Sequence, residues 1–178
     1  PISAGKNIEL AEEIPHQLSG GNHVKKYGLA MVLGITALIF ALSFSASAQL
    51  STADELAALL DDLSGVLGEL VNNGFTIEHF ELDSLGLQGT YPVEYRFAAG
   101  YEYIIVGIGG PAISDLDLYL YDSEGNQLAH DLEYGRFPTL LFDVEEEGTL
   151  HIFFRNFRLA NGYSDMFPYY FSFVIAAR

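Results

Sequence analysis

Two aspartates two residues apart are the metal-binding candidates of this sequence. Asp115 and Asp117 lie in an alternating segment, residues 115–121, and a β-strand there would place both carboxylates on one face. Hard cations such as calcium bind carboxylate and carbonyl oxygens, but the spacing of an EF-hand loop is absent. We therefore expect a solvated acidic face, with one aspartate accepting a loop amide, and keep calcium as an alternative.

Two tyrosines follow the aspartates on the same predicted face. Tyr119 and Tyr121 alternate with leucines that would point the other way. Aromatic side chains are enriched in binding interfaces, so this face could bind a sugar ring or a protein surface. The alternative is that the tyrosines form cross-strand pairs that stabilise a solvent-facing sheet. The sequence favours neither a binding surface nor a solvent-facing sheet over the other.

No motif for catalysis is found. His79, His130 and His151 follow no zinc-binding spacing, and no serine lies in a G-x-S-x-G context. Cysteine is absent, which excludes thiol chemistry and disulfides. We predict a protein that is not an enzyme and has no cofactor, calcium excepted.

The charge balance restricts the partners. The chain has 24 acidic and 8 basic residues, for a net charge of −16. Such a chain repels nucleic acids and anionic membrane surfaces. An extracellular or envelope protein or polysaccharide remains as a partner, as does self-association.

The segment 24–48 has the pattern of a cleaved signal peptide. Lys25 and Lys26 precede an uncharged apolar run, residues 29–44, and Ala46-Ser47-Ala48 forms a small-residue cleavage site. An uncut anchor is the alternative, but the run is shorter than a membrane span requires. The sequence therefore predicts a signal-peptide helix and export to the periplasm or the outside of the cell.

Residues 1–23 precede this signal peptide and need a separate explanation. The sequence begins with Pro1, and a secretory start would fall at Val24. Our hypothesis is that residues 1–23 are translated upstream sequence that is not made in the cell. A genomic start codon at Val24 would support this hypothesis.

Residues 49–74 predict an amphipathic helix. Ser51 or Thr52 would cap it, Asp54 and Glu55 would lie in its first turn, and Gly74 would end it in the left-handed conformation. The helix could pack on its own sandwich or on a partner. Asp61, Asp62 and Glu69 should lie off the apolar stripe, whose predicted members are Leu56, Leu59, Leu60, Leu63, Leu67, Leu70 and Val71.

From residue 76 onward the pattern changes to short strands separated by glycine turns. No helical pattern separates the strands, so the sequence predicts an all-β antiparallel sandwich. The alternation of residues 115–121 predicts that the sheet which contains them buries one face. The predicted strands are 76–82, 91–97, 101–108, 115–121, 127–130, 139–144, 149–157 and 169–176.

Several of these segments together resemble the bacterial pre-peptidase C-terminal domain. They are Tyr95-Arg96-Phe97, Ala99-Gly100-Tyr101, Asp115-Leu116-Asp117, Gly125-Asn126, Gly148-Thr149-Leu150 and Tyr170-Phe171-Ser172-Phe173. The resemblance implies a jelly-roll-like β-sandwich over residues 75–178 in an exported protein. It also implies an appendage of secreted peptidases, some relatives of which bind calcium or extracellular polymers.

These observations predict an exported, non-catalytic β-sandwich protein that acts in binding or assembly at the cell envelope or outside the cell. One alternative is an accessory or stability module for a separate secreted enzyme. Another is a subunit that assembles into a surface layer or fibre, because contacts that do not close give filaments.

Overall fold

A computed structural model of the chain describes residues 52–178. The predicted signal-peptide helix, residues 1–23 and the capping residue Ser51 lie outside the described part. The described chain begins with one helix, which eight strands follow. They are α2 (Thr52–Asn72), β1 (Thr76–Leu85), β2 (Thr90–Phe97), β3 (Glu102–Gly109), β4 (Ile113–Tyr121), β5 (Gln127–Asp131), β6 (Thr139–Asp143), β7 (Gly148–Leu159) and β8 (Tyr169–Ala177).

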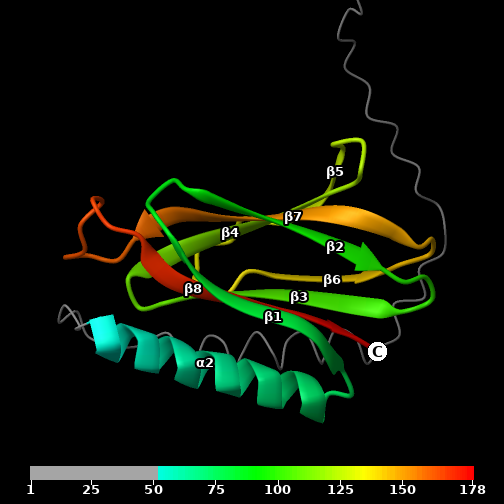
Figure 1. Ribbon diagram of the computed structural model, residues 1–178, viewed down its shortest axis with the longest axis horizontal. Coiled ribbons are helices and arrows are strands. Elements are labelled where there is room, and N and C mark those ends of the chain that lie inside the picture. Colours follow the sequence, from blue (N-terminus) through cyan, green and yellow to red (C-terminus); the bar gives the residue numbers. More distant parts are fainter. Residues whose placement is uncertain (1–51) are drawn as a thin grey trace, which may run out of the picture.

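The strands form two antiparallel four-stranded sheets in jelly-roll order. One sheet has the order β1-β8-β3-β6 and the other the order β2-β7-β4-β5. The pairs β1–β8, β2–β7, β3–β6 and β4–β5 are those of one long hairpin rolled onto itself. Figure 1 shows three layers, with α2 below the first sheet and the second sheet above. The predicted all-β, jelly-roll-like sandwich with a preceding helix is confirmed, although β1 and β7 run further than expected.

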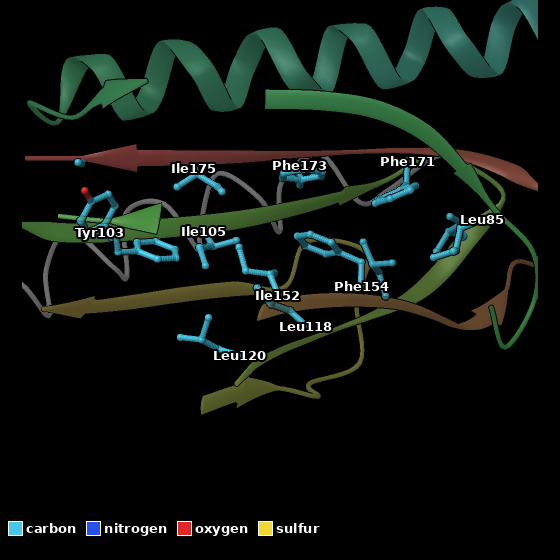
Figure 2. Packing of buried hydrophobic residues seen from close by; sticks show 14 of the residues in the cluster. Leu85, Tyr103, Ile105, Leu118, Leu120, Ile152, Phe154, Phe171, Phe173 and Ile175 are labelled. Carbon is cyan, nitrogen blue, oxygen red and sulfur yellow. The ribbon is translucent and has the colours of Figure 1, made fainter. Parts of the chain in front are cut away.

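The main core lies between the two sheets. Leu116, Leu118 and Leu120 of β4 are buried, as the alternation predicted. Figure 2 shows rings from β7 and β8 between the layers, and the rings of Phe154 and Phe173 stack with centroids 4.9 Å apart. Offset ring pairs of this kind add to the free energy that apolar burial supplies.

A second core lies between α2 and the first sheet. On β3, Ile104, Val106 and Ile108 point away from the main core and are buried, as are Val174 and Ala176 on β8. These strands are therefore apolar on both faces. The helix supplies the cover with Leu59, Leu63, Val66 and Leu70.

The helix packs on its own sandwich, but its buried face differs from the predicted stripe. Leu60 and Val71 are exposed, whereas Asp62 is buried. The buried positions repeat at the helical spacing along a narrower stripe, and Leu60 and Val71 lie beyond its edge. Gly74 ends the helix with φ of 83°, as predicted.

An ion pair explains the buried position of Asp62. Arg136, from the segment between β5 and β6, places Nη1 2.7 Å from Oδ2 of Asp62. The same nitrogen donates to the carbonyl oxygen of Gly109 on β3 at 2.9 Å. Burial raises the pKa of Asp62, and the nearby guanidinium opposes that increase. The pair therefore fastens the helix to the sandwich.

We expect the helix cover to stabilise the fold through Leu59. Leu59→Ala should lower the free energy of unfolding by about 2–5 kcal/mol because a fully buried side chain is lost. The neighbouring Leu60→Ala is the matched control, since that side chain is 48% exposed, and it should change stability by less than about 0.5 kcal/mol. Urea unfolding of both variants measures the difference, and equal losses would contradict the packing.

Removing one partner of the buried ion pair should also be costly. Arg136→Met leaves the Asp62 carboxylate buried without its cation, and we expect a loss of about 3–5 kcal/mol. Arg96→Met, which removes an exposed pair with Glu147, should cost about 1 kcal/mol or less. Thermal or urea unfolding compares the two variants, and similar losses would show that Arg136 does not fasten the helix.

Candidate functional site

The outer face of the second sheet carries the predicted tyrosines. Since Leu118 and Leu120 point into the main core, Tyr119 and Tyr121 point outward, and both are half-buried. In the register, Tyr119 lies opposite Phe153 and Tyr121 opposite His151 on β7. One row across the four strands consists of Pro92, Phe153, Tyr119 and His130. All four side chains carry rings, so ring-bearing residues occupy neighbouring positions across the outer face of this sheet.

An open groove of about 700 Å³ lies over part of this face. That volume is within the usual range of ligand sites. In Figure 1, β5 stands out from the sheet above β7. Residues 122–125 of the turn between β4 and β5 line the groove. The lining residues are Thr90, Tyr119, Tyr121, Asp122, Ser123, Glu124, Gly125, His151, Phe153 and Arg155.

Two rings in the groove are held in place by their neighbours. The rings of Tyr121 and Phe153 meet edge to face, with centroids 5.5 Å apart and an interplanar angle of 87°. The hydroxyl of Tyr121 donates to Oε1 of Gln127 at 3.1 Å. A rigid ring surface loses little conformational entropy when a ligand binds.

The Arg155 side chain at the other end of the groove is also held in place. Its Nη2 donates to Oε1 of Gln88, and its guanidinium lies 5.5 Å from the ring centroid of Phe157. Gln88 has φ of 60°, which is unfavourable for a residue with a side chain. Its Nε2 donates to the carbonyl oxygen of Phe157 at 2.7 Å, and this bond helps to hold the unusual conformation.

The β4–β5 turn that lines the groove is ordered by Asp122. Oδ1 of Asp122 accepts the amides of Glu124 at 2.9 Å and Asn126 at 2.8 Å, and Oδ2 accepts Nδ2 of Asn126 at 2.8 Å. These hydrogen bonds lower the pKa of the Asp122 carboxyl group. Gly125 takes φ of 88°, so the predicted Gly-Asn turn is present.

The expected solvated acidic face is wrong. Asp115 and Asp117 are only 6% and 5% exposed. The segment between β5 and β6 contacts β4 at Asp115 and Leu116. The amide of Leu116 donates to the carbonyl oxygen of Gly135 at 2.8 Å, and Oδ1 of Asp115 accepts the amide of Gly135 at 3.3 Å. The predicted hydrogen bond from a loop amide to one aspartate is therefore confirmed.

Asp117 holds a side chain of the groove by a hydrogen bond. Its Oδ2 accepts the hydroxyl of Tyr119 at 3.1 Å, and it lies opposite Arg155 in the strand register. Burial raises the pKa of Asp117 more than the Tyr119 hydrogen bond and the Arg155 charge lower it. Within residues 52–178, no three or more His, Asp or Glu residues are placed to hold a metal ion. Calcium binding by Asp115 and Asp117 stays a prediction.

The three histidines within residues 52–178 lie in different surroundings. The ring centroids of His79 and Phe173 lie 5.6 Å apart. Nδ1 of His130 forms a hydrogen bond with Nε2 of Gln127 at 2.8 Å. Nδ1 of His151 lies 3.5 Å from Oε1 of Glu94. Among them, only His151 lines the groove.

Sequence reasoning missed Phe153, Arg155 and Thr90 as parts of this face. The alternation of residues 149–157 places Ile152 and Phe154 in the core, and so already directs Phe153 and Arg155 outward. The missing information was the pairing of β7 with β4, which joins segments more than 30 residues apart.

Comparisons with known proteins give little beyond the fold. No family model matches the chain, and no curated protein matches it. Among solved structures, the pre-peptidase C-terminal domain of a collagenase from Bacillus anthracis is similar, with 13% identity and a TM-score of 0.42. The match covers 55% of this chain and 87% of that one. Within residues 52–178, no helix has the length and hydrophobicity that a bilayer crossing requires.

Burial of Asp117 predicts a pH-dependent difference in stability. Its folded pKa is raised above the ordinary 3.8, so the cost of ionising it is absent at low pH and grows as the pH rises above 3.8. Asp117→Asn removes that cost, so the stability of this variant relative to the wild type should rise from about pH 4 to pH 7.

Asp122→Asn should show the opposite trend. Its folded pKa is lowered from 3.8, so the carboxylate stabilises the fold above that pH and loses this effect as the pH falls. The deficit of Asp122→Asn should therefore be largest near neutral pH and shrink in acid. Urea unfolding across this pH range measures both variants, and parallel trends would contradict the assigned environments.

Proposed function

We propose that this chain is an exported, non-catalytic β-sandwich protein that binds an extracellular or envelope polysaccharide in the groove of the second sheet. The observation that carries the proposal is the set of rings from Tyr119, Tyr121 and Phe153 in one groove, on a rigid sheet.

The chemistry of the groove suits a neutral, hydroxyl-rich polymer. A sugar ring has an apolar C–H face that packs on aromatic rings, and its hydroxyl groups hydrogen-bond to polar side chains at the edges. Arg155 and His151 supply donors, and Asp122 and Glu124 supply acceptors. Because charges of both signs line the groove, and the whole chain carries −16, an acidic polymer is disfavoured.

The hydrogen bonds in the groove support a binding role over catalysis. The hydroxyl groups of Tyr119 and Tyr121 donate to Asp117 and Gln127, so both have fixed partners. Burial raises the pKa of Tyr119, which disfavours the phenolate that a catalytic base would need.

Export is supported by the sequence of residues 24–48. The basic residues, the apolar run and the small-residue cleavage site are the evidence for it.

Affinity electrophoresis of the full chain in gels that contain neutral soluble polysaccharides tests this function. Hydroxyethyl cellulose, galactomannan and dextran are the probes, and we expect at least one to retard the wild-type protein. Tyr121→Ala and Phe153→Ala should each weaken binding about tenfold, since each removes one ring from the contact surface.

Tyr101→Ala is the matched control because Tyr101 is exposed and does not line the groove. It should bind like the wild type. Migration unchanged by all three polymers would overturn the proposed function. Equal binding by the groove variants and the wild type would overturn the assignment of the groove.

A further inference from the structure

A second pocket lies at the start of α2, against the segment between β7 and β8. Figure 1 shows the start of the helix and this segment at the same end of the molecule. The pocket has a volume of about 400 Å³, and it shares no lining residue with the groove. The lining residues are Thr52, Glu55, Ser84, Tyr163, Phe167, Pro168, Tyr169 and Tyr170.

Half of the lining residues are aromatic. The rings of Tyr163 and Tyr169 meet edge to face, with centroids 5.4 Å apart. The Tyr169 hydroxyl donates to the carbonyl oxygen of Ser164 at 2.8 Å and accepts its amide at 3.0 Å, which fixes this ring. Phe167 and Tyr170 add two more rings to the lining. The face of an aromatic ring is negative and attracts cations.

A buried carboxylate lies in the same pocket. Glu55 is only 7% exposed, and it hydrogen-bonds to the side chain of Tyr163. Burial raises the pKa of Glu55 more than this hydrogen bond lowers it. None of the described residues that line the pocket is basic. Buried carboxylates usually have a cationic partner. A cationic ligand in the pocket would supply such a partner for Glu55.

Asp62 provides an internal comparison on the same helix. It lies seven residues after Glu55, on the same helix face, and it is also 7% exposed. Asp62 has the guanidinium of Arg136 at 2.7 Å, whereas none of the lining residues at Glu55 within 52–178 is basic. In the described part of the chain, the two buried acids therefore differ in that a protein cation lies beside the second.

We propose that the pocket at Glu55 binds a protonated primary amine, with the ammonium group at the carboxylate and the alkyl stem between the rings. An ammonium group has three donors. The Glu55 carboxylate and the hydroxyl oxygens of Thr52 and Ser84 are the acceptors in the lining. A primary amine uses these acceptors together with the rings, whereas a quaternary ammonium ion has no hydrogen to donate. The net charge of −16 also attracts cations to the molecule.

Titration of the full chain with butylammonium chloride tests this site, followed by calorimetry or by the NMR signals of the tyrosine rings. We expect saturable binding at millimolar concentrations. Butanol, which has the same shape without the charge, should bind about tenfold or more weakly, since the charge contacts are lost. Tetramethylammonium should also bind more weakly, because it cannot donate to Glu55.

Two variants locate the site, and a third is the control. Glu55→Gln and Phe167→Ala should each weaken butylammonium binding about tenfold, since one removes the charge and the other an exposed ring. Asp61→Asn, which changes an exposed acid of the same helix, should bind like the wild type. If Glu55→Gln fails to fold, the binding of butylammonium by Phe167→Ala shows whether the amine binds in this pocket.

Three results would overturn the amine site. They are equal binding of butanol and butylammonium, unchanged binding by a folded Glu55→Gln variant, and absence of saturable binding by the wild type. The last two are expected if Glu55 only caps the amides of its own helix. None of these results bears on polysaccharide binding, because the groove contains neither Glu55 nor Phe167.

Discussion

Strands β3 and β8 carry apolar side chains on both of their faces, and this constraint organises the rest of the molecule. Their inner faces join the main core, and their outer faces carry Ile104, Val106, Ile108, Val174 and Ala176. An exposed sheet with these side chains would be prone to associate with other chains. The helix α2 removes this apolar surface from water, so the helix is an integral part of the domain.

The two sheets consequently have different roles. Strands β3 and β8 of the first sheet are covered on both faces, whereas the second sheet buries its leucine side and presents rings and polar groups on the other. Its outer face is therefore available for a ligand, and the hydrogen bonds of Gln88, Asp117 and Asp122 hold the side chains around it. The rigidity of this face follows from the jelly-roll pairing that places β4 beside β7.

The segment between β5 and β6 connects these parts. Arg136 reaches the helix through Asp62 and reaches β3 through Gly109, while the preceding Gly135 pairs with the backbone of Leu116 on β4. The close approach favours a glycine at position 109, because an added Cβ there would lie 3.1 Å from Cβ of Arg136 and 3.0 Å from Cγ2 of Ile113, both tight contacts. One irregular segment thus fastens the helix and contacts β4.

Features set by local pattern were predictable, and features set by distant contacts were not. Alternation and glycine turns predicted the strands, the alternating leucines of β4 predicted one wall of the core, and Gly74 marked the end of the helix. Burial of Asp115 could not be predicted, because its hydrogen-bond partner Gly135 lies 20 residues away in the sequence. The same holds for Asp62, whose partner Arg136 is distant in the sequence.

For the candidate site, the sequence indicated Tyr119 and Tyr121 but not their surroundings. The strand pairing brings Phe153 and Arg155 beside them, and no local pattern encodes that pairing. The left-handed backbone conformation of Gln88 could not be predicted from the sequence either, since glycine usually occupies this conformation.

The central claim is that the open face of the second sheet, and not the helix-covered first sheet, binds a neutral polysaccharide. Backbone amide chemical shifts of the isotope-labelled full chain, recorded during titration with neutral oligosaccharides from the retarding polymer, test it most directly. The account predicts saturable shifts that cluster on the outward positions of β4 and β7 and on the β4–β5 turn, with α2, β3 and β8 unaffected. Shifts centred on α2 or on the first sheet would contradict it.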